Sequence, residues 1–377
     1  MMDIPFCRKR NFPRESSGKN QGTILILFVL SLLFFFLART IPMRKANSIT
    51  DEMIEASKIM TEATESLKEC QKEKGISLEN NSDINQTGLI GLEFSSITTS
   101  VGSLEAKRTT TNPNFAGLVV FLLKEAGVKK GDTIAVGASG SFPGLIVAVL
   151  SAAKSMDLRP LVICSLGASQ WGANSLDFHW LHMQDCLLKK EVFVIEPIEL
   201  TLGGALDIGE DMDAEGRALL IKDIKESGIL FLHESDLASN VKAKMDLYEE
   251  KAGENEIRAF INIGGNWANI GIDSEILKLK PGLVRIKKFP PADRRGVLYE
   301  MAARDIPVVH LLFIKGLVER YGLPWDPVPL PKPGDGKIYQ HVREKQPEFF
   351  FLAVFYMLLV SLVLFFRNKL NARCRKS

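Results

Sequence analysis

Three loops rich in glycine, serine and asparagine each follow a short apolar run of the kind that forms a buried strand. They are the segments 137–144 (GASGSFPG), 169–174 (SQWGAN) and 263–271 (IGGNWANIG). Small residues let a ligand approach the backbone, and free N–H groups at a helix N-terminus attract anions. Because parallel strands end at one edge of their sheet, where ligands bind, we predict that the three loops share one crevice.

The ligand expected in this crevice is polar or anionic, such as a carboxylate or a phosphate. The spacing matches neither a dinucleotide-binding fingerprint nor a Walker loop, so no cofactor is expected. Each loop could instead be a turn without a ligand, in which glycine and asparagine supply positive φ. The residues expected to bind the ligand are Gly137, Ser139, Gly140, Ser141, Gly144, Ser169, Trp171, Asn174, Gly264, Gly265, Asn266 and Trp267.

Ser139 is also a possible nucleophile, because it lies on a strand–turn–helix segment like the elbow of α/β hydrolases. The sequence is GASGS, however, and not the G-x-S-x-G of that motif. Attack by Ser139 would need a histidine as base, and His233, which follows an apolar run, is the one we single out. A simpler interpretation is that Ser235 or Asp236 caps the helix that begins there. Whether the chain is an enzyme therefore stays open.

Charged segments offer two further possibilities. Residues 285–295 form either an anion-contact strip or ordinary solvated surface. The segment 203–213 is acidic but lacks the spacing of a calcium loop, so we expect it to be solvated. Because no CxxC motif or Cys/His spacing typical of zinc is present, we predict no metal site. The basic residues of the strip are Arg285, Lys287, Lys288, Arg294 and Arg295.

Strands and helices alternate through the centre of the chain. The first strand, glycine loop, helix and second strand form a βαβ crossover, which is right-handed and makes a parallel sheet. We therefore predict a doubly wound, mostly parallel, Rossmann-like α/β domain over residues 109–320. The expected strands are 133–137, 159–166, 192–195, 259–263 and 308–313, and the expected helices are 115–126, 144–156, 213–227, 236–251 and 293–304.

Two segments flank this domain. Residues 46–108 comprise an amphipathic helix at 48–74 and a linker, and we expect the helix to hold the domain off a membrane or to pair with another helix. Within that linker, residues 89–99 are expected to form a strand or a short pairing segment. Residues 321–347 are rich in proline, which indicates an extended linker.

Uncharged apolar stretches lie near both ends of the chain. Residues 22–38 are a run of 17, and the predicted span 348–366 contains a run of 18. Both are long enough to cross a bilayer core as helices. The first resembles a signal peptide in position, but Arg39 follows it without a small-residue cleavage pattern, which favours an uncleaved anchor.

The distribution of charge predicts the membrane topology. The tails 1–21 and 367–377 are basic, which favours the cytoplasm for both and places the middle of the chain outside. Three cysteines (Cys70, Cys164 and Cys186) would then lie outside, and their pairing is open because their number is odd. In residues 46–345 acidic side chains outnumber basic ones by eight, which argues against a nucleic-acid binder.

Between the two terminal spans the chain carries GASGSFPG, SLGASQWGAN, INIGGNWANIG and HLLFIKGLVERYGLPWDPVPLP. This combination resembles the poly-γ-glutamate system proteins, bacterial membrane proteins that accompany the subunits making poly-γ-glutamate capsules. The resemblance covers Thr109 to Pro331. It implies a pathway and a place in the cytoplasmic membrane, with the bilayer and the polymer or its synthesis subunits as partners. It implies no catalytic residue.

The sequence leaves three functions open. The first is an accessory component of poly-γ-glutamate synthesis or export that binds the anionic polymer or partner subunits outside the membrane. The second is a serine-type hydrolase or transferase that acts on γ-glutamyl chains. The third is an assembly scaffold, in which the helix 48–74 and both spans dock other membrane subunits.

Overall fold

The computed structural model describes residues 17–77, 81–195, 197–340 and 347–374. The chain divides into two compact units, Ser48–Val342 and the terminal segments before and after it. Helix α1 (Ser17–Glu73) contributes to both units, and α12 (Pro347–Cys374) to the terminal one. The stretches predicted at 22–38 and 48–74 thus belong to one continuous helix.

The terminal unit holds two helices that are long and apolar enough to cross a membrane, Gln21–Ala38 and Phe350–Lys369. The expectation of two apolar helices near the termini is confirmed. The ring of Phe34 packs on that of Tyr356 with centroids 5.1 Å apart, and the hydroxyls of Ser31 and Tyr356 lie 2.7 Å apart. Such hydroxyl contacts join helices within apolar surroundings. Residues 1–16 and 375–377 of the predicted basic tails lie outside the described residues.

A six-stranded sheet with the order β3-β2-β1-β4-β6-β5 forms the centre of the larger unit. Neighbours pair in parallel except β5, which runs antiparallel to β6. The expected mixed α/β fold with a mostly parallel sheet is therefore confirmed. The strands are β1 (Thr133–Ser139), β2 (Arg159–Ser165), β3 (Glu199–Thr201), β4 (Ile257–Ile263), β5 (Gly282–Val284) and β6 (Val308–Leu311).

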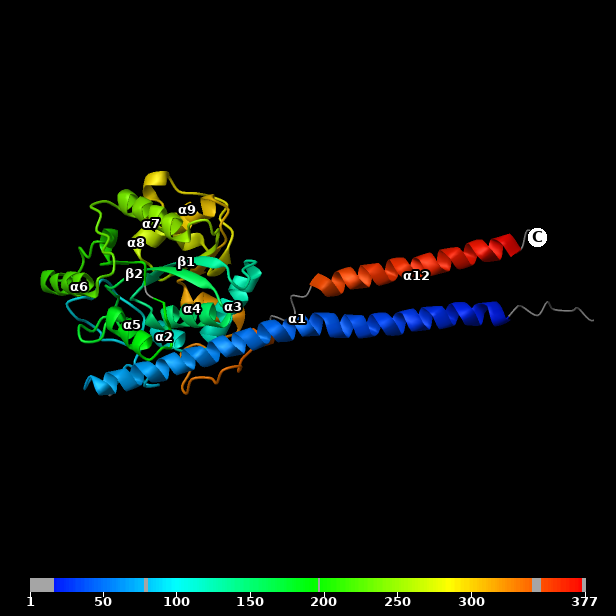
Figure 1. Cartoon of the computed structure of the whole chain (residues 1–377), viewed down its shortest axis with the longest axis horizontal. Helices are drawn as coiled ribbons and strands as arrows, with labels where there is room; N and C mark the ends of the chain where they lie inside the picture. The colour runs from blue at the N-terminus through cyan, green and yellow to red at the C-terminus, as the bar shows by residue number, and fades with distance from the viewer. Residues whose placement is uncertain (1–16, 78–80, 196, 341–346, 375–377) are drawn as a thin grey trace, which may run out of the picture. The chain divides into compact units, whose positions relative to one another are not determined.

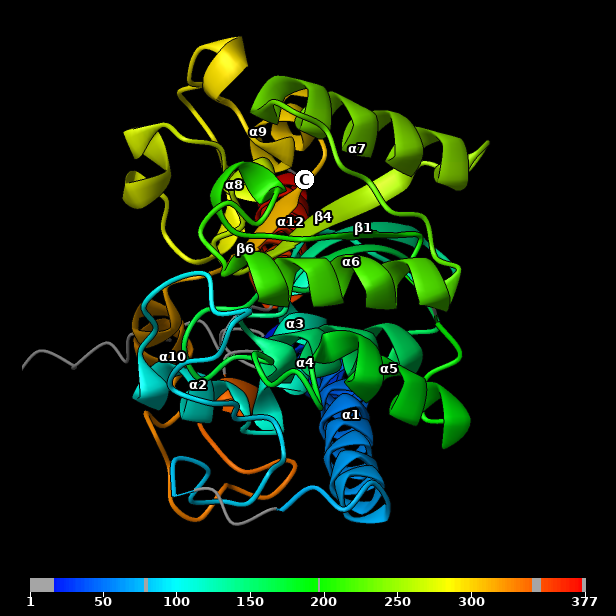
Figure 2. The same cartoon turned by 90° about the vertical axis from the view of Figure 1, so that its left-hand side faces the viewer.

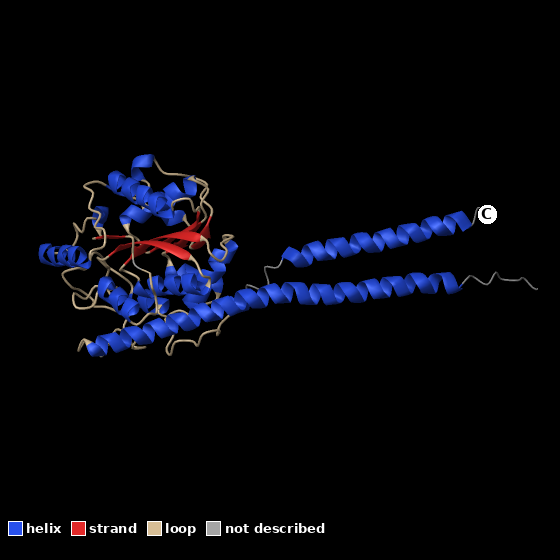
Figure 3. Ribbon diagram, viewed as in Figure 1, coloured by secondary structure: helices blue, strands red, loops and turns tan. Residues whose placement is uncertain are grey.

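Helices cover both faces of the sheet, as Figures 1 and 2 show. One face carries α7 (Leu237–Ala252), α8 (Trp267–Ile270) and α9 (Val297–Ala303), and the other carries α3 (Asn114–Glu125) and α4 (Pro143–Ser155). The strands lie between helices on both sides (Figure 3), so all of β1 and the last five residues of β4 are buried, and these segments are mostly apolar. Further helices are α2 (Leu104–Thr110), α5 (Trp180–Lys189), α6 (Ala214–Ser227) and α10 (Ile314–Tyr321), and short 3₁₀ turns include η1 (Ala205–Asp207), η2 (Ser274–Lys278) and η3 (Ala292–Arg294).

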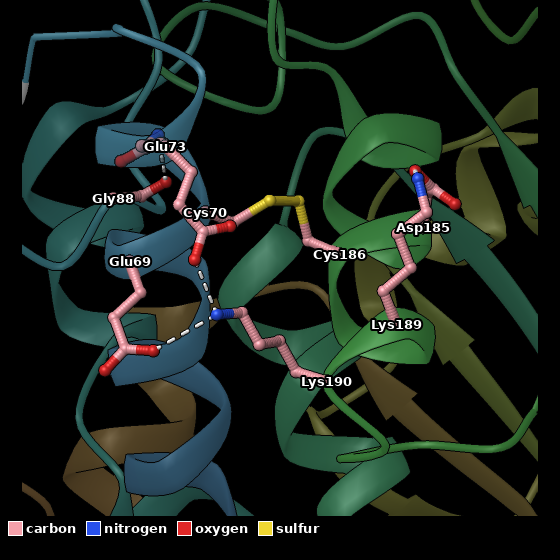
Figure 4. Close-up of a disulfide and its surroundings, with 9 residues drawn as sticks. Glu69, Cys70, Glu73, Gly88, Asp185, Cys186, Lys189 and Lys190 are labelled. Carbon is pink, nitrogen blue, oxygen red and sulfur yellow. Dashed lines mark hydrogen bonds and ion pairs between the residues drawn. A yellow bond between two sulfur atoms is a disulfide. The ribbon is translucent and has the colours of Figure 1, made fainter.

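From Ser48 onward, α1 packs against its own domain. Its stripe of Met53, Met60 and Leu67 is buried, and the Glu52 carboxylate lies 2.7 Å from the Lys124 ammonium on α3. A disulfide joins Cys70 to Cys186 on α5 (Figure 4). It settles the cysteine pairing that the sequence left open, and Cys164 is a buried free thiol.

Removing this disulfide is expected to lower the free energy of unfolding by about 2–4 kcal/mol, because the closed loop spans 116 residues and its loss frees the unfolded chain. The test is denaturant unfolding of the full chain carrying Cys70→Ser and Cys186→Ser, in detergent. The reduced wild type should behave like the variant, and non-reducing electrophoresis should separate it from the oxidised form. Equal stability of oxidised and reduced wild type would contradict a native disulfide.

Two expected elements differ in the structure. Residues 192–195 are not a strand, because the backbone N–H groups of Val192 and Phe193 bond to the Leu187 carbonyl in the last turn of α5, and both side chains are buried. The strand beside β2 is β3 instead. The expected helix 293–304 is divided into η3 and α9, because Arg295 between them is extended.

The proline-rich segment is part of the larger unit as far as residue 340. Arg108 on α2 forms an ion pair with Asp326, and Asn114 donates to the Lys332 carbonyl at 3.0 Å. The Tyr339 hydroxyl donates to Asn114 Oδ1 at 2.5 Å. Residues 321–340 are therefore fixed against the domain, and residues 341–346 of the predicted linker lie outside the described part of the chain.

Candidate functional site

A pocket of about 810 Å³ opens at the carboxyl edge of the sheet. The end of every parallel strand contributes to it: Ser139 at the end of β1, Gly167 after β2, Gly204 after β3, Gly265 after β4 and His310 in β6. The strand order reverses between β1 and β4, which is where ligands bind in open α/β sheets. The three predicted loops thus share one pocket.

Six of the twelve residues predicted to bind a ligand line this pocket. They are Ser139, Ser141, Ser169, Gly265, Asn266 and Trp267. Large apolar side chains also line it, and several of them are exposed. They include Phe142, Leu277, Leu312, Phe313 and Trp325. The lining therefore combines polar groups with an apolar wall.

The other six predicted residues serve the fold. The Asn174 amide is buried and bonds to both backbone groups of Leu92 (2.8 and 2.9 Å) and to the Thr98 hydroxyl (2.9 Å). With the neighbouring Trp171 backbone, it holds the segment 91–98 against the loop after β2. Thr98 bridges to Ala168, so the expected short pairing segment is present.

The predicted glycines outside the pocket allow close packing. A Cβ at Gly144 would lie 2.7 Å from the Thr110 carbonyl oxygen, so glycine there lets α2 approach α4. A Cβ at Gly137 would lie 2.7 Å from Asn269 Oδ1, and one at Gly140 would lie 2.8 Å from the Leu166 carbonyl oxygen. Gly264 has a φ of +80°, which makes the turn after β4. These glycines shape the site without facing a ligand.

Lys107 on α2 lines the pocket, and the sequence analysis did not single it out. Its side chain is 3% exposed, and its ammonium lies 3.8 Å from the centroid of the Phe142 ring. It donates to the Ser169 hydroxyl at 2.7 Å and to the Ser141 carbonyl. No acidic side chain among the described residues pairs with it. Burial lowers the pKa of Lys107 to about 7, so near neutrality the amine is present in both charge states.

The three serines of the pocket are linked through their loops. The Ser169 N–H donates to the Ser141 hydroxyl at 2.9 Å, and the Ser141 N–H donates to the Ser139 hydroxyl at 3.2 Å. Ser169 is the serine whose hydroxyl contacts the amine of Lys107. An anion bound here could accept hydrogen bonds from the serine hydroxyls and pair with the Lys107 ammonium. In its neutral form, Lys107 could act as a base toward Ser169.

His310 is the histidine that lines the pocket. The Asn262 amide nitrogen gives one hydrogen to the Gly264 carbonyl (2.9 Å) and faces His310 Nδ1 at 3.0 Å. Nδ1 therefore accepts, and the ring proton lies on Nε2. Burial lowers the pKa of His310 to about 4, so the ring is neutral at neutral pH. It can donate one hydrogen bond to a ligand.

His233, the predicted partner of Ser139, does not line the pocket. It is exposed and stacks on Phe231 with ring centroids 5.7 Å apart. The simpler interpretation of this segment holds, because the Asp236 carboxylate accepts from the Ser239 N–H at 2.9 Å and caps α7. The structure thus gives Ser139 no support from His233.

A buried ionic cluster lies beside the pocket. Asp207 accepts from the Lys244 ammonium (2.5 Å), the Thr201 hydroxyl (2.9 Å) and the Asn266 amide (2.5 Å). The expectation that the acidic segment 203–213 is solvated is wrong for Asp207, which is fully buried because Lys244 on α7 reaches it. Asn266 also caps α8, so this cluster fixes the loop that enters the pocket. Nearby, burial raises the pKa of Glu199 to about 7.

Most of the basic strip is paired with acidic side chains. Lys288 lies 2.9 Å from Glu275, Arg294 lies 3.3 Å from Asp273 and Arg295 lies 3.6 Å from Glu300. The other two members, Arg285 and Lys287, are exposed. None of the five lines the pocket.

Comparisons with protein-family models, with curated proteins and with solved structures find no match for this chain. The geometry of the pocket is therefore the evidence from which a function is argued.

Proposed function

We propose that this chain is a membrane-anchored accessory protein of poly-γ-glutamate synthesis or export, and that its pocket binds carboxylates of a γ-glutamyl chain. The observation that carries the proposal is Lys107, a buried amine at a pocket wall with no acidic partner among the described residues. A buried charge is costly unless it is paired. A ligand carboxylate would supply the missing partner and form a charge-assisted hydrogen bond.

The remainder of the pocket suits the same ligand. Hydroxyls of Ser139, Ser141 and Ser169 can donate to carboxylate oxygens, and the apolar wall can pack against the methylene groups of a γ-glutamyl backbone. A volume of about 810 Å³ is that of a small-molecule site. The pocket would therefore hold a chain end or a few residues of the polymer.

Two features support a location of the central domain on the outer side of the cytoplasmic membrane. The Cys70–Cys186 disulfide is typical of proteins in oxidising compartments. The two apolar helices, combined with the basic sequence of the tails, support a topology with both termini in the cytoplasm. The strand order around the β1–β4 reversal supports a Rossmann-like arrangement, from which the antiparallel β5 departs.

The acidic charge of the central chain opposes binding of a polyanion at the surface. The basic strip does little to offset it, since three of its five members are already in ion pairs. We therefore place the carboxylate contact at Lys107 and not at the strip. The scaffold role of the helix 48–74 is less favoured, because its apolar stripe is buried against its own domain.

A second candidate function is acyl transfer at the γ-amide bond. It is favoured by the contact of 2.7 Å between Lys107 Nζ and Ser169 Oγ, together with the lowered pKa of the amine. In its neutral form Lys107 would take the proton of Ser169 as the hydroxyl attacks the amide carbonyl. The amide C–N bond would then break, with the Lys107 proton passing to the departing amine, and water or a second amine would take the acyl group from Ser169. Ser169 replaces Ser139 as the nucleophile in this version, because Ser139 has no such base beside it.

The test of the proposal is calorimetric titration of the full chain, in detergent, with short γ-glutamyl oligomers. We expect Lys107→Met to weaken binding at least tenfold, since a hydrogen bond to a charged group contributes about 1.5–3 kcal/mol. Methionine fills the same space without a charge, so the fold should be retained. Amidated oligomers, which lack carboxylates, should bind the wild type as weakly as the acid form binds the variant.

Lys129→Met is the matched control, because Lys129 is exposed in the turn before β1, at the edge of the sheet opposite the pocket. It should leave the affinity unchanged. Absence of binding by the wild type, or equal binding by Lys107→Met, would remove the proposed role. Ser169→Ala separates the two functions: a binding protein leaves oligomer length unchanged with or without it, whereas a transferase alters oligomer length only when Ser169 is present.

A further inference from the structure

A second cluster of polar side chains lies apart from the pocket, where the start of α5 meets α6. It consists of His179, which precedes α5, His182 in its first turn, and Asp223 on α6. One possible ligand atom from each residue lies within 4.8 Å of the others. His179 Nε2 is 3.0 Å from Asp223 Oδ2, and the two imidazole centroids are 4.1 Å apart.

Each of the two histidines has a ring nitrogen without a hydrogen-bond partner among the described residues. His179 is fully buried, and its Nδ1 has no hydrogen-bond partner among the described residues. The same is true of Nδ1 of His182. A neutral imidazole nitrogen without a hydrogen-bond partner can bind a metal ion.

The charged side chains around the two histidines favour the binding of a cation. Besides Asp223, the carboxylates of Asp177 and Asp185 act on His182, against one opposing lysine, Lys74. Asp185 is itself 2.6 Å from Lys189, so its charge is partly offset. The Asp223 side chain is 29% exposed. An ion held here would therefore have three ligands from the protein and one position open to solvent.

We propose that His179, His182 and Asp223 bind a zinc ion. Two imidazole nitrogens and one carboxylate are a donor set that zinc accepts, whereas calcium and magnesium require mainly oxygen ligands. The ion would join α5, which the Cys186 disulfide ties to α1, to α6. No local zinc spacing marks this site in the sequence, because Asp223 lies 44 residues from His179 and is brought close to it by the fold.

The test uses the untagged full chain in detergent, stripped with a chelator and then titrated with zinc chloride. We expect one zinc per chain by elemental analysis and a rise in Tm on addition of zinc. His182→Ala should weaken zinc binding at least a hundredfold and abolish the rise in Tm. His182 is chosen because it is only partly buried, so that its loss should leave the fold intact; Asp223→Asn is the second variant.

His233→Ala is the matched control, since it removes an exposed histidine outside the cluster. It should bind zinc as the wild type does. The proposal is overturned if the wild type retains no zinc, if both His182→Ala and Asp223→Asn bind it as tightly as the wild type, or if calcium or magnesium competes at equal concentration. These outcomes do not depend on the function proposed for the pocket.

Discussion

Replacement of Lys244 by methionine is expected to lower the free energy of unfolding by about 3–5 kcal/mol, which is the usual consequence of removing one partner of a buried ion pair. The side chains of Lys244 and Asp207 are 2% and 0% exposed, and their charged atoms are 2.5 Å apart. Without the lysine, Asp207 would keep its bonds from Thr201 and Asn266 but would carry an uncompensated charge.

The control is a second ion pair on the same helix. Lys242 lies 2.5 Å from Asp246, but these side chains are 77% and 58% exposed. Because solvent screens such a pair, Lys242→Met should change the stability by no more than about 0.5 kcal/mol. Denaturant unfolding of the full chain in detergent compares the two variants directly. A loss of less than about 1 kcal/mol for Lys244→Met would contradict the assignment of a buried pair.

A double variant separates the contribution of the charge to the free energy of unfolding from that of side-chain packing. Asp207 has a φ of +68°, a conformation that asparagine tolerates well, so Asp207→Asn preserves the backbone while it removes the charge. Combined with Lys244→Met, it leaves no unpaired charge in the cluster and should recover part of the lost stability. If the double variant were less stable than Lys244→Met alone, the destabilisation would have to come from packing.

The cluster also explains why the loop after β4 is held in place. Asn266 donates to Asp207 and caps α8, so the same residue joins the ionic cluster to the pocket. The sequence suggested Asn266 as a ligand residue because of its amide. The structure shows that part of this amide is already committed to Asp207, which lies 59 residues away in sequence.

The general form of the fold follows from local patterns. β1, β2 and β4 were predicted because strands buried on both faces are continuously apolar, and α4 because a glycine loop must lead from β1 into a crossover helix. The short β3 was misplaced, because the more apolar Val192 and Phe193 bond to the last turn of α5 and do not extend the sheet. Apolar character alone does not distinguish these two uses.

Lys107 shows why the chemistry of the pocket was harder to predict. In sequence it lies in a polar stretch beside the basic Arg108, and nothing local marks it as buried. Its burial depends on the approach of α2 to α4, which the absence of a Cβ at Gly144 permits. The sequence predicted that a ligand approaches Gly144 closely, but in the structure it is α2 that does so.

The affinity for γ-glutamyl oligomers is expected to fall about tenfold for each pH unit above 7, because a carboxylate binds the protonated form of Lys107. The free protein holds the pKa of this amine at about 7, whereas a bound carboxylate would raise it. Below pH 7 the amine is already protonated and the affinity should level off. His310, with a pKa of about 4, does not titrate in this range and adds no slope.

Calorimetric titration at pH values from 6 to 9.5 measures this dependence, and Lys107→Met should show a flat profile.

The stability of the free protein should rise with pH, whereas the affinity falls. The pKa of Lys107 in the folded state is below its unfolded value of 10.5, so the unfolded chain binds more protons between these values, and the cost of burying the amine declines as the pH rises. Lys107→Met should therefore be more stable than the wild type at pH 6, with the difference shrinking towards pH 10. Because a lysine that serves packing alone would not weaken ligand binding as it deprotonates, affinity that stays constant up to pH 9.5 would assign Lys107 to the fold and not to the ligand.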